Sequence, residues 1–269
     1  MPILKTREEI RNKIREACKK LILSQQMLTL CETKATPKQE EFLWEVLQKE
    51  VQHREKNKKA RQLNQAAFPV LKSFVDYEFK SVRFPPGLRQ EELIGLEFIP
   101  QNRNVILYGP VGIGKTHMAI ALGVKACQEG MQVRFFTVTE LVLKLSEAHR
   151  AGTFERFVRD LRKLDLLILD EWGYVPVDKM GSQLLFRVIA DSYERKSLIL
   201  TTNLEFSKWG GIFTDEQMAA AMIDRLIHHG HLLIFEGQSY RMTHALMRKT
   251  AAEAKEKEKS DATKGSASI

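Results

Sequence analysis

Residues 109–116, GPVGIGKT, form the segment whose composition and spacing are best suited to chemistry. They fit the pattern G-x-x-x-x-G-K-[ST] and lie between an apolar run and a helix-forming run, which is the context this motif requires. In such a loop, backbone N–H groups turn toward an anion at the start of a helix. We expect Lys115 to contact the β- and γ-phosphates of ATP and the Thr116 hydroxyl to bind Mg²⁺. The predicted ATP-binding residues are Gly109, Pro110, Val111, Gly112, Ile113, Gly114, Lys115, Thr116 and His117.

A pair of carboxylates ends the apolar run of residues 165–171, DLLILDE. A buried central strand of this kind would deliver Asp170 and Glu171 to the edge of a sheet where ligands bind. We expect Asp170 to hold Mg²⁺ together with Thr116, and Glu171 to polarise the attacking water, which would make the site hydrolytic. Read alone, the pair is also compatible with a helix N-cap after a strand, but the phosphate loop upstream favours the catalytic interpretation.

Three further polar residues, which lie in or after later predicted strands and helices, are candidates for catalysis. Asn203 ends the apolar run 197–203 and is predicted to orient the water or to contact the γ-phosphate. Arg225 has three interpretations: a surface residue, a partner of Asp224, or an arginine finger presented to ATP bound by a neighbouring subunit. Such fingers accelerate known enzymes by about 10³–10⁵. Arg241 follows the last apolar run and is expected to contact the nucleotide of its own subunit.

The histidines at positions 228, 229 and 231 do not predict a metal site. No second group of ligands lies at a suitable spacing in the sequence, and a Mg²⁺-nucleotide site takes oxygen ligands. We therefore expect Mg²⁺, held by Thr116 and Asp170, to be the metal of this protein.

The elements that must position these residues alternate along the chain. Short apolar runs rich in β-branched residues are separated by helical stretches, which is typical of parallel strands with crossover helices on both faces. We expect an α/β fold of the phosphate-loop NTPase type, with a five-stranded parallel sheet flanked by helices. Trp172 and Trp209 are interpreted as packing residues. The runs predicted to form strands are residues 104–109, 132–138, 165–171, 197–203 and 231–237.

The remaining sequence predicts a division into parts. We expect a helical N-terminal domain at residues 1–66, a connector at 67–103, the ATPase domain at 104–249 and a disordered tail at 250–269, which is poor in apolar residues. One buried helix face in the first part is predicted from apolar residues at three- and four-residue intervals. These residues are Ile10, Ile14, Leu21, Phe42, Leu43, Val46, Leu47 and Val51.

Charge and composition restrict the partners and the compartment. The chain of 269 residues has a formal net charge of +8, which suits a polyanion such as nucleic acid. A basic run at residues 53–61 is either a solvated helix face or a phosphate-binding surface. Apolar runs of signal-peptide or membrane-spanning length are missing from the sequence. Three widely spaced cysteines are typical of free thiols in a reducing compartment, so we expect a cytoplasmic protein without a membrane partner.

Taken in order, GPVGIGKT, DLLILDE, LILTTN, MIDRL and SYR resemble the AAA+ ATPase superfamily in its initiator and helicase-loader branch. The short segment after the last strand fits a branch without a C-terminal helical lid. Residues 170–203 and 206–242 closely resemble the IstB family, the ATPase helpers of insertion-sequence transposition, which are related to the DnaC helicase loaders. The resemblance extends from about residue 40 to residue 248.

This resemblance implies properties that the spacing alone does not. IstB-like proteins self-assemble on duplex DNA with ATP, deform it and present it to a partner transposase, and transposase contact is linked to ATP turnover. The matching positions assign catalytic roles to Lys115, Glu171, Asn203, Arg225 and Arg241. Initiator-type ATPases also carry an extra helix on their DNA-facing side. The matching basic stretch, residues 139–163, is either that surface or a pair of solvated helix faces, and its candidate DNA contacts are Lys144, Arg150, Arg156, Arg159, Arg162 and Lys163.

Two other functions remain compatible with the residues. A DnaC-like replicative helicase loader would share the ATPase core but act on a helicase ring and single-stranded DNA. A binding module would use ATP as a static switch, although Glu171 and Arg225 argue against it because binding alone requires neither.

Overall fold

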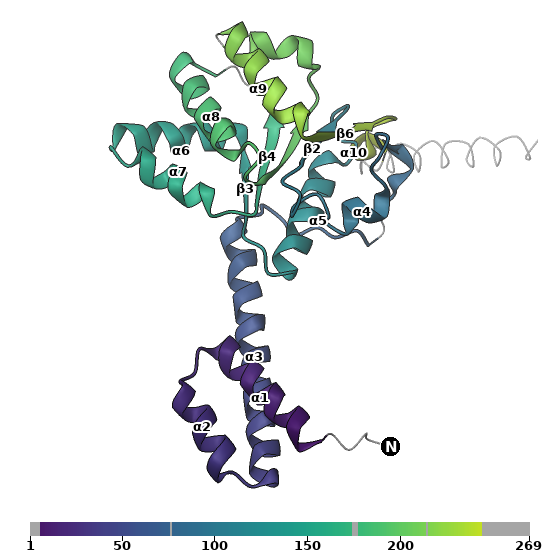
Figure 1. Ribbon diagram of the computed structural model, residues 1–269. Helices are drawn as coiled ribbons and strands as arrows, with labels where there is room; N and C mark the ends of the chain where they lie inside the picture. The colour runs from purple at the N-terminus through teal and green to yellow at the C-terminus, as the bar shows by residue number, and fades with distance from the viewer. Residues whose placement is uncertain (1–5, 76, 174–176, 214, 244–269) are drawn as a thin grey trace, which may run out of the picture. The chain divides into compact units, whose positions relative to one another are not determined.

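The computed structural model describes residues 6–75, 77–173, 177–213 and 215–243. The chain divides into two compact units, Met1–Gln62 and Leu63–Ile269. Figure 1 shows the elements of each unit. The tail predicted to be disordered, residues 250–269, lies outside the described residues. Of the segment after the last strand, on which the prediction about a lid depends, only residues 236–243 are described.

The N-terminal unit is built from helices α1 (Arg7–Leu21), α2 (Gln25–Lys34) and the first part of α3 (Pro37–Ala66). Proline is tolerated at the first helical position, where the backbone N–H has no partner within the helix. The helices enclose a small apolar core, and Arg7 and Arg11 pair with the buried carboxylate of Glu40. The buried core residues are Ile10, Ile14, Ala17, Cys18, Leu21, Leu28, Cys31 and Leu47.

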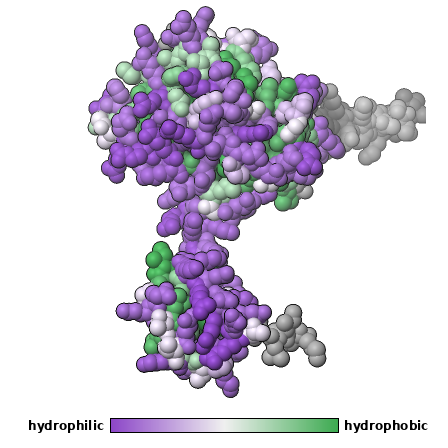
Figure 2. Space-filling model, viewed as in Figure 1, coloured by the Kyte–Doolittle hydropathy of each residue, from purple (hydrophilic) through white to green (hydrophobic). Residues whose placement is uncertain are grey.

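The predicted buried face is wrong at two positions of α3. Phe42 and Val46 are exposed, at 68% and 47%, whereas Leu43 and Val51 pack against the core formed around Leu47. Residues 43, 47 and 51 share one line of the helix at four-residue spacing, and residues 42 and 46 lie on the neighbouring line. The apolar stripe is therefore narrower than the pattern predicted. Figure 2 shows some hydrophobic residues at the surface of this unit, among mainly hydrophilic ones.

The second unit contains a six-stranded sheet of order β1-β6-β2-β5-β4-β3. The five predicted strands are present and parallel. The additional strand, β1, has only two residues and pairs with β6 antiparallel at the sheet edge. The strands are β1 (Val82–Arg83), β2 (Asn104–Tyr108), β3 (Val133–Thr137), β4 (Leu166–Trp172), β5 (Ser197–Thr202) and β6 (Gly230–Phe235).

Helices cover both faces of the sheet, as expected for parallel strands (Figure 1). Because successive strand residues point to opposite faces, Leu166 and Ile168 of β4 join the core beneath α5, while Leu167 and Leu169 join the core beneath α6 to α9. The helices are α4 (Gln90–Ile94), α5 (Lys115–Gln128), α6 (Val138–Arg150), α7 (Phe154–Arg162), α8 (Lys179–Ser192), α9 (Glu216–His228) and α10 (Tyr240–Thr243). Short 3₁₀ helices occupy Phe79–Ser81 and Phe206–Gly211.

Several smaller expectations agree with this fold. Trp172 and Trp209 are completely buried and lie with ring centroids 5.0 Å apart, so they are packing residues. The three cysteines are buried and free. Within the described ranges, the helices are too short or too polar to span a bilayer.

Candidate nucleotide-binding site

The phosphate loop connects β2 to α5, as predicted. Gly109 follows β2 and lies so close to β6 that an added Cβ atom would be 2.5 Å from the carbonyl oxygen of Phe235. Gly114 caps α5 with φ of 107°, a conformation that L-residues rarely adopt. Only glycine meets both requirements, and the backbone N–H groups at the start of a helix such as α5 favour an anion.

Lys115 is buried against its own loop. Its Nζ donates to the carbonyl oxygens of Gly109 at 2.7 Å and Pro110 at 2.6 Å. Burial lowers the pKa of Lys115 to about 8; the carboxylate of Asp170 opposes this shift and Arg241 reinforces it. The desolvated ammonium therefore lies in a position where phosphate oxygens would be favourable partners.

Thr116 and Asp170 come together across the sheet. The Thr116 hydroxyl donates to Asp170 Oδ1 at 2.9 Å, although the two residues are far apart in the chain. Thr201 of β5, which the sequence did not single out, also donates its hydroxyl to Asp170 Oδ1. The site thus contains the carboxylate and hydroxyl oxygens that Mg²⁺ prefers, and these residues fit the ion.

Glu171 has an unusual backbone for a strand residue. Its φ is 62°, and the pairing of β4 with β5 shifts register between Leu169 and Trp172. The Glu171 N–H donates to the Thr201 hydroxyl at 3.0 Å, and the side chain is exposed. The bulge therefore turns Glu171 out of the strand alternation while Asp170 stays buried beside it.

The segment after β6 returns to the phosphate loop. The backbone N–H of Tyr240 donates to the carbonyl oxygen of Gly112 at 3.0 Å. An added Cβ atom on Gly112 would lie 2.2 Å from Ser239 Oγ and 3.7 Å from Arg241 Cβ. Arg241 is therefore next to the loop.

The connector contributes residues that the sequence did not single out. The Tyr77 hydroxyl donates to the carbonyl oxygen of Gly114 at 3.3 Å, and its ring lies 5.0 Å from that of His117. His117 Nε2 is 2.8 Å from the carbonyl oxygen of Ser73. Burial raises the pKa of Tyr77. The only sequence signal was the aromatic content of the connector, which does not specify its partner.

Asn203 and Arg225 are placed differently from the residues of the loop. Asn203 follows β5 directly and is exposed. Arg225 lies on α9, where its Nη1 donates to the carbonyl oxygen of Ala221 at 2.9 Å and its guanidinium lies 5.1 Å from the Phe186 ring centroid. Contacts between described residues do not join Arg225 to the phosphate loop.

The basic stretch forms two helices, α6 and α7, separated by a short turn that contains Gly152. Half of the candidate DNA contacts are engaged within the chain: Lys144 pairs with Glu140, Arg162 with Asp191 and Lys163 with Asp160. Among the described residues, the ion pairs do not include the other three cations, which are exposed: Arg150, Arg156 and Arg159. The basic run at 53–61 lies on α3, where Arg54 pairs with Glu50.

The largely parallel sheet, the glycine-rich loop and the Thr116–Asp170 pair define a nucleotide-binding protein of the phosphate-loop type. The comparison with protein families gives a more specific result. Residues 18–248 match the family described as IstB-like ATP binding protein, and the chain belongs to that family.

Two relatives illustrate this similarity. The chain is 41% identical, over 75% of its length and 76% of the relative's, to the insertion sequence IS21 putative ATP-binding protein of Pseudomonas aeruginosa. It is 36% identical, over 75% of its length and 80% of the relative's, to the insertion sequence IS5376 putative ATP-binding protein of Geobacillus stearothermophilus.

Solved structures resemble the chain more weakly. The DnaC helicase loader matches with a TM-score of 0.46 and 20% identity over 53% of this chain and 86% of that chain. DnaI matches with a TM-score of 0.49 and 14% identity over 61% of this chain and 91% of that chain. Neither likeness carries an argument about function.

Proposed function

We propose that this protein is an ATP-dependent helper of insertion-sequence transposition. It assembles on duplex target DNA, remodels it and presents it to a partner transposase, and ATP hydrolysis accompanies its release. The observation that carries the proposal is the family match over residues 18–248 together with relatives whose names associate an ATP-binding protein with an insertion sequence.

The arrangement of the loop supports binding of Mg²⁺-ATP. The N–H groups at the start of α5 and the Lys115 ammonium would hold the phosphates, and Thr116 with Asp170 would hold Mg²⁺. The bound Mg²⁺ would neutralise charge on the phosphate oxygens. Arg241, beside Gly112, would contact the nucleotide from the same subunit.

Hydrolysis requires groups that act on water and on developing charge. Glu171 is exposed beside the buried Asp170 and would accept a proton from the attacking water. Asn203, at the end of the neighbouring strand, would orient that water. Arg225 would stabilise charge on the phosphate bound by an adjacent copy, which requires a homo-oligomer with ATP at subunit interfaces.

The cations on α6 and α7 support DNA binding through the phosphate backbone. Arg150, Arg156 and Arg159 are exposed and lie outside the ion pairs of the described residues, so they are the best candidates for this role. Contacts with phosphates carry little sequence information, and binding should weaken steeply with salt. Remodelling 20–30 bp of duplex costs about 1–6 kcal/mol, which many subunits on one duplex could offset.

The deciding experiment measures assembly with duplex and single-stranded DNA of equal length, each with ATP and Mg²⁺. Electron microscopy and sedimentation should reveal ATP-dependent assemblies on duplex DNA, and Lys115→Ala should not form them. Preferential assembly on single-stranded DNA would instead favour a helicase loader. Persistent monomers across protein and salt concentrations would contradict both functions.

A further inference from the structure

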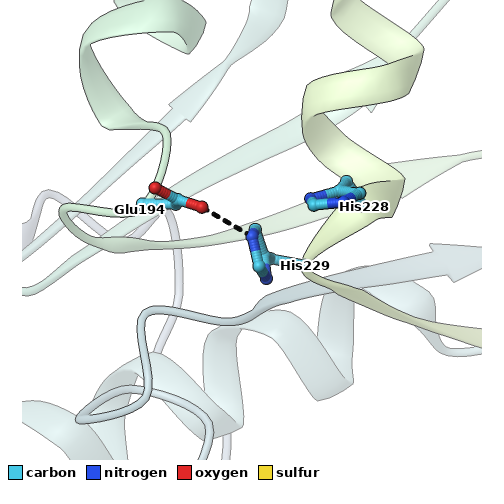
Figure 3. Close-up of side chains that lie close together, drawn as sticks. All are labelled: Glu194, His228 and His229. Carbon is cyan, nitrogen blue, oxygen red and sulfur yellow. Dashed lines mark hydrogen bonds and ion pairs between the residues drawn. The ribbon is translucent and has the colours of Figure 1, made fainter.

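The loop between α8 and β5 places a carboxylate beside two consecutive histidines at the end of α9. Glu194, His228 and His229 each offer one ligand atom, and these atoms all lie within 4.8 Å of one another (Figure 3). His229 Nε2 is 2.7 Å from Glu194 Oε1. The sequence did not predict a metal here because no second ligand group was visible, but the fold supplies Glu194 from a different element.

The backbone explains how neighbouring residues meet at one point. In a regular helix, consecutive side chains are about 100° apart around the axis. His228 is the last residue of α9, and His229 leaves the helix with φ of −116° and ψ of 39°, so the two rings can approach, with centroids 4.4 Å apart. Helix termination therefore produces the histidine pair.

Glu194 is held in position by contacts outside the trio. Its φ of 57° is uncommon for a residue other than glycine. Its carbonyl oxygen accepts from Asn102 Nδ2 at 3.0 Å, and the preceding residue, Tyr193, has its hydroxyl 3.0 Å from His228 Nδ1. Contacts of this kind orient metal ligands in known sites.

We propose that Glu194, His228 and His229 form a site for a divalent transition-metal ion of the Zn²⁺ type, separate from the Mg²⁺ of the nucleotide site. Two imidazoles and one carboxylate suit Zn²⁺, Co²⁺ or Ni²⁺, whereas Mg²⁺ prefers oxygen ligands. Tetrahedral Zn²⁺ with ligands at about 2.0–2.2 Å needs donor atoms roughly 3.4 Å apart. The donor atoms already lie within 4.8 Å of one another, and the exposed side chains of Glu194 and His229 leave room for the adjustment that this separation would require.

A metal at this site would affect the packing of α9. Arg225 lies one helical turn before His228 and contacts Phe186 of α8. A metal bound by the trio would attach the end of α9 to the loop that follows α8. It would therefore stabilise the packing of the helix that carries Arg225, without contact with the nucleotide.

Isothermal titration of the chelator-treated full chain with Zn²⁺ tests the proposal, in excess Mg²⁺ and without nucleotide. We expect one saturable Zn²⁺ per chain and a rise in the melting temperature, because ligand that binds only the folded state stabilises it. Glu194→Gln and His228→Gln should each weaken binding by about tenfold or more, because loss of a ligand should cost at least as much as loss of a residue that only orients one. His149→Gln, an exposed histidine of α6, should leave it unchanged.

The visible spectrum of the Co²⁺-substituted chain identifies the ligands independently of any variant. Nitrogen and oxygen ligands give d–d bands without the thiolate-to-cobalt charge transfer that the cysteines would produce. Thiolate bands would overturn the proposal, as would the absence of saturable binding or equal affinity in the parent, Glu194→Gln and His228→Gln. If a variant fails to fold, the spectrum and stoichiometry of the parent chain decide the question.

Discussion

The phosphate loop and helix α9 hold their functional side chains in different ways. In the loop region, Lys115, Thr116 and Asp170 contact one another or the loop backbone, and all belong to one chain. On α9, Arg225 rests on Phe186 and on a carbonyl of its own helix. One chain thus assembles the residues proposed to bind ATP, whereas the residue proposed to complete hydrolysis remains apart. If Arg225 acts in trans as proposed, hydrolysis requires a second copy.

The largest effect should come from Arg225→Ala. Loss of a finger acting in trans should reduce ATP turnover by about 10³-fold or more, while ATP binding is retained. Mixed oligomers of Arg225→Ala and Lys115→Ala should recover part of the activity, since some interfaces then combine an intact loop with an intact arginine. Absence of recovery in mixtures that assemble normally would contradict a role in trans and remove the distinction between the two regions.

Glu171→Gln should lower ATP turnover but leave ATP binding intact. The amide cannot accept a proton from water, so turnover should fall by about 10²–10⁴-fold. ATP affinity, measured by titration calorimetry, should remain close to that of the parent. Glu205→Gln, an exposed carboxylate beyond β5, is the matched control and should retain turnover. Equal turnover in Glu171→Gln and the parent would favour a static switch.

The pH dependence of ATP binding should distinguish Lys115 from an exposed lysine. Its pKa is lowered to about 8 by burial, and bound phosphates would raise it. Below pH 8 the ammonium is charged in both states; above it, the free protein loses a proton that binding must restore. Affinity should therefore fall by up to about tenfold per pH unit above 8. Calorimetry in buffers of different ionisation enthalpy should detect proton uptake, and pH-independent affinity would contradict this assignment.

The smallest effect concerns two cations near the end of α7. Arg159 is exposed and outside the described ion pairs, whereas Lys163 lies 2.7 Å from Asp160. Arg159→Ala should reduce the slope of log K against log salt for duplex binding by about 0.9, and Lys163→Ala should reduce it less. Equal slopes in the parent and Arg159→Ala would identify the face of α7 as solvated only.

The sequence predicted the parts of the site that depend on local pattern. The loop with its flanking strand and helix, and the two carboxylates at the end of β4, are each continuous in the sequence. Their placement could therefore be predicted from the motif and from the apolar runs beside it. Arg241 was expected to contact the nucleotide because it comes soon after the last apolar run, and it lies beside Gly112 of the loop.

Residues whose role depends on a distant partner were missed. Thr201 lies inside an apolar strand, and only pairing of β4 with β5 brings its hydroxyl to Asp170 and Glu171. Tyr77 reaches Gly114 through the path of the connector, and Glu194 meets His229 through the packing of two elements. The two-residue β1 has too few residues for a periodic signal. In α3, the apolar residues at 42 and 46 lie on the line of side chains next to residues 43, 47 and 51. The apolar spacing alone did not show which of the two lines is buried.

The left-handed backbone of Glu171 has a consequence for how this protein can change. At φ of 62°, a residue other than glycine is held in a conformation that typically costs of the order of 1–3 kcal/mol. Glycine at this position would relieve the strain and also remove the carboxylate. If Glu171 is the catalytic base as proposed, selection for heat resistance alone would favour its loss, and thermal stability and turnover would place opposite demands on this position.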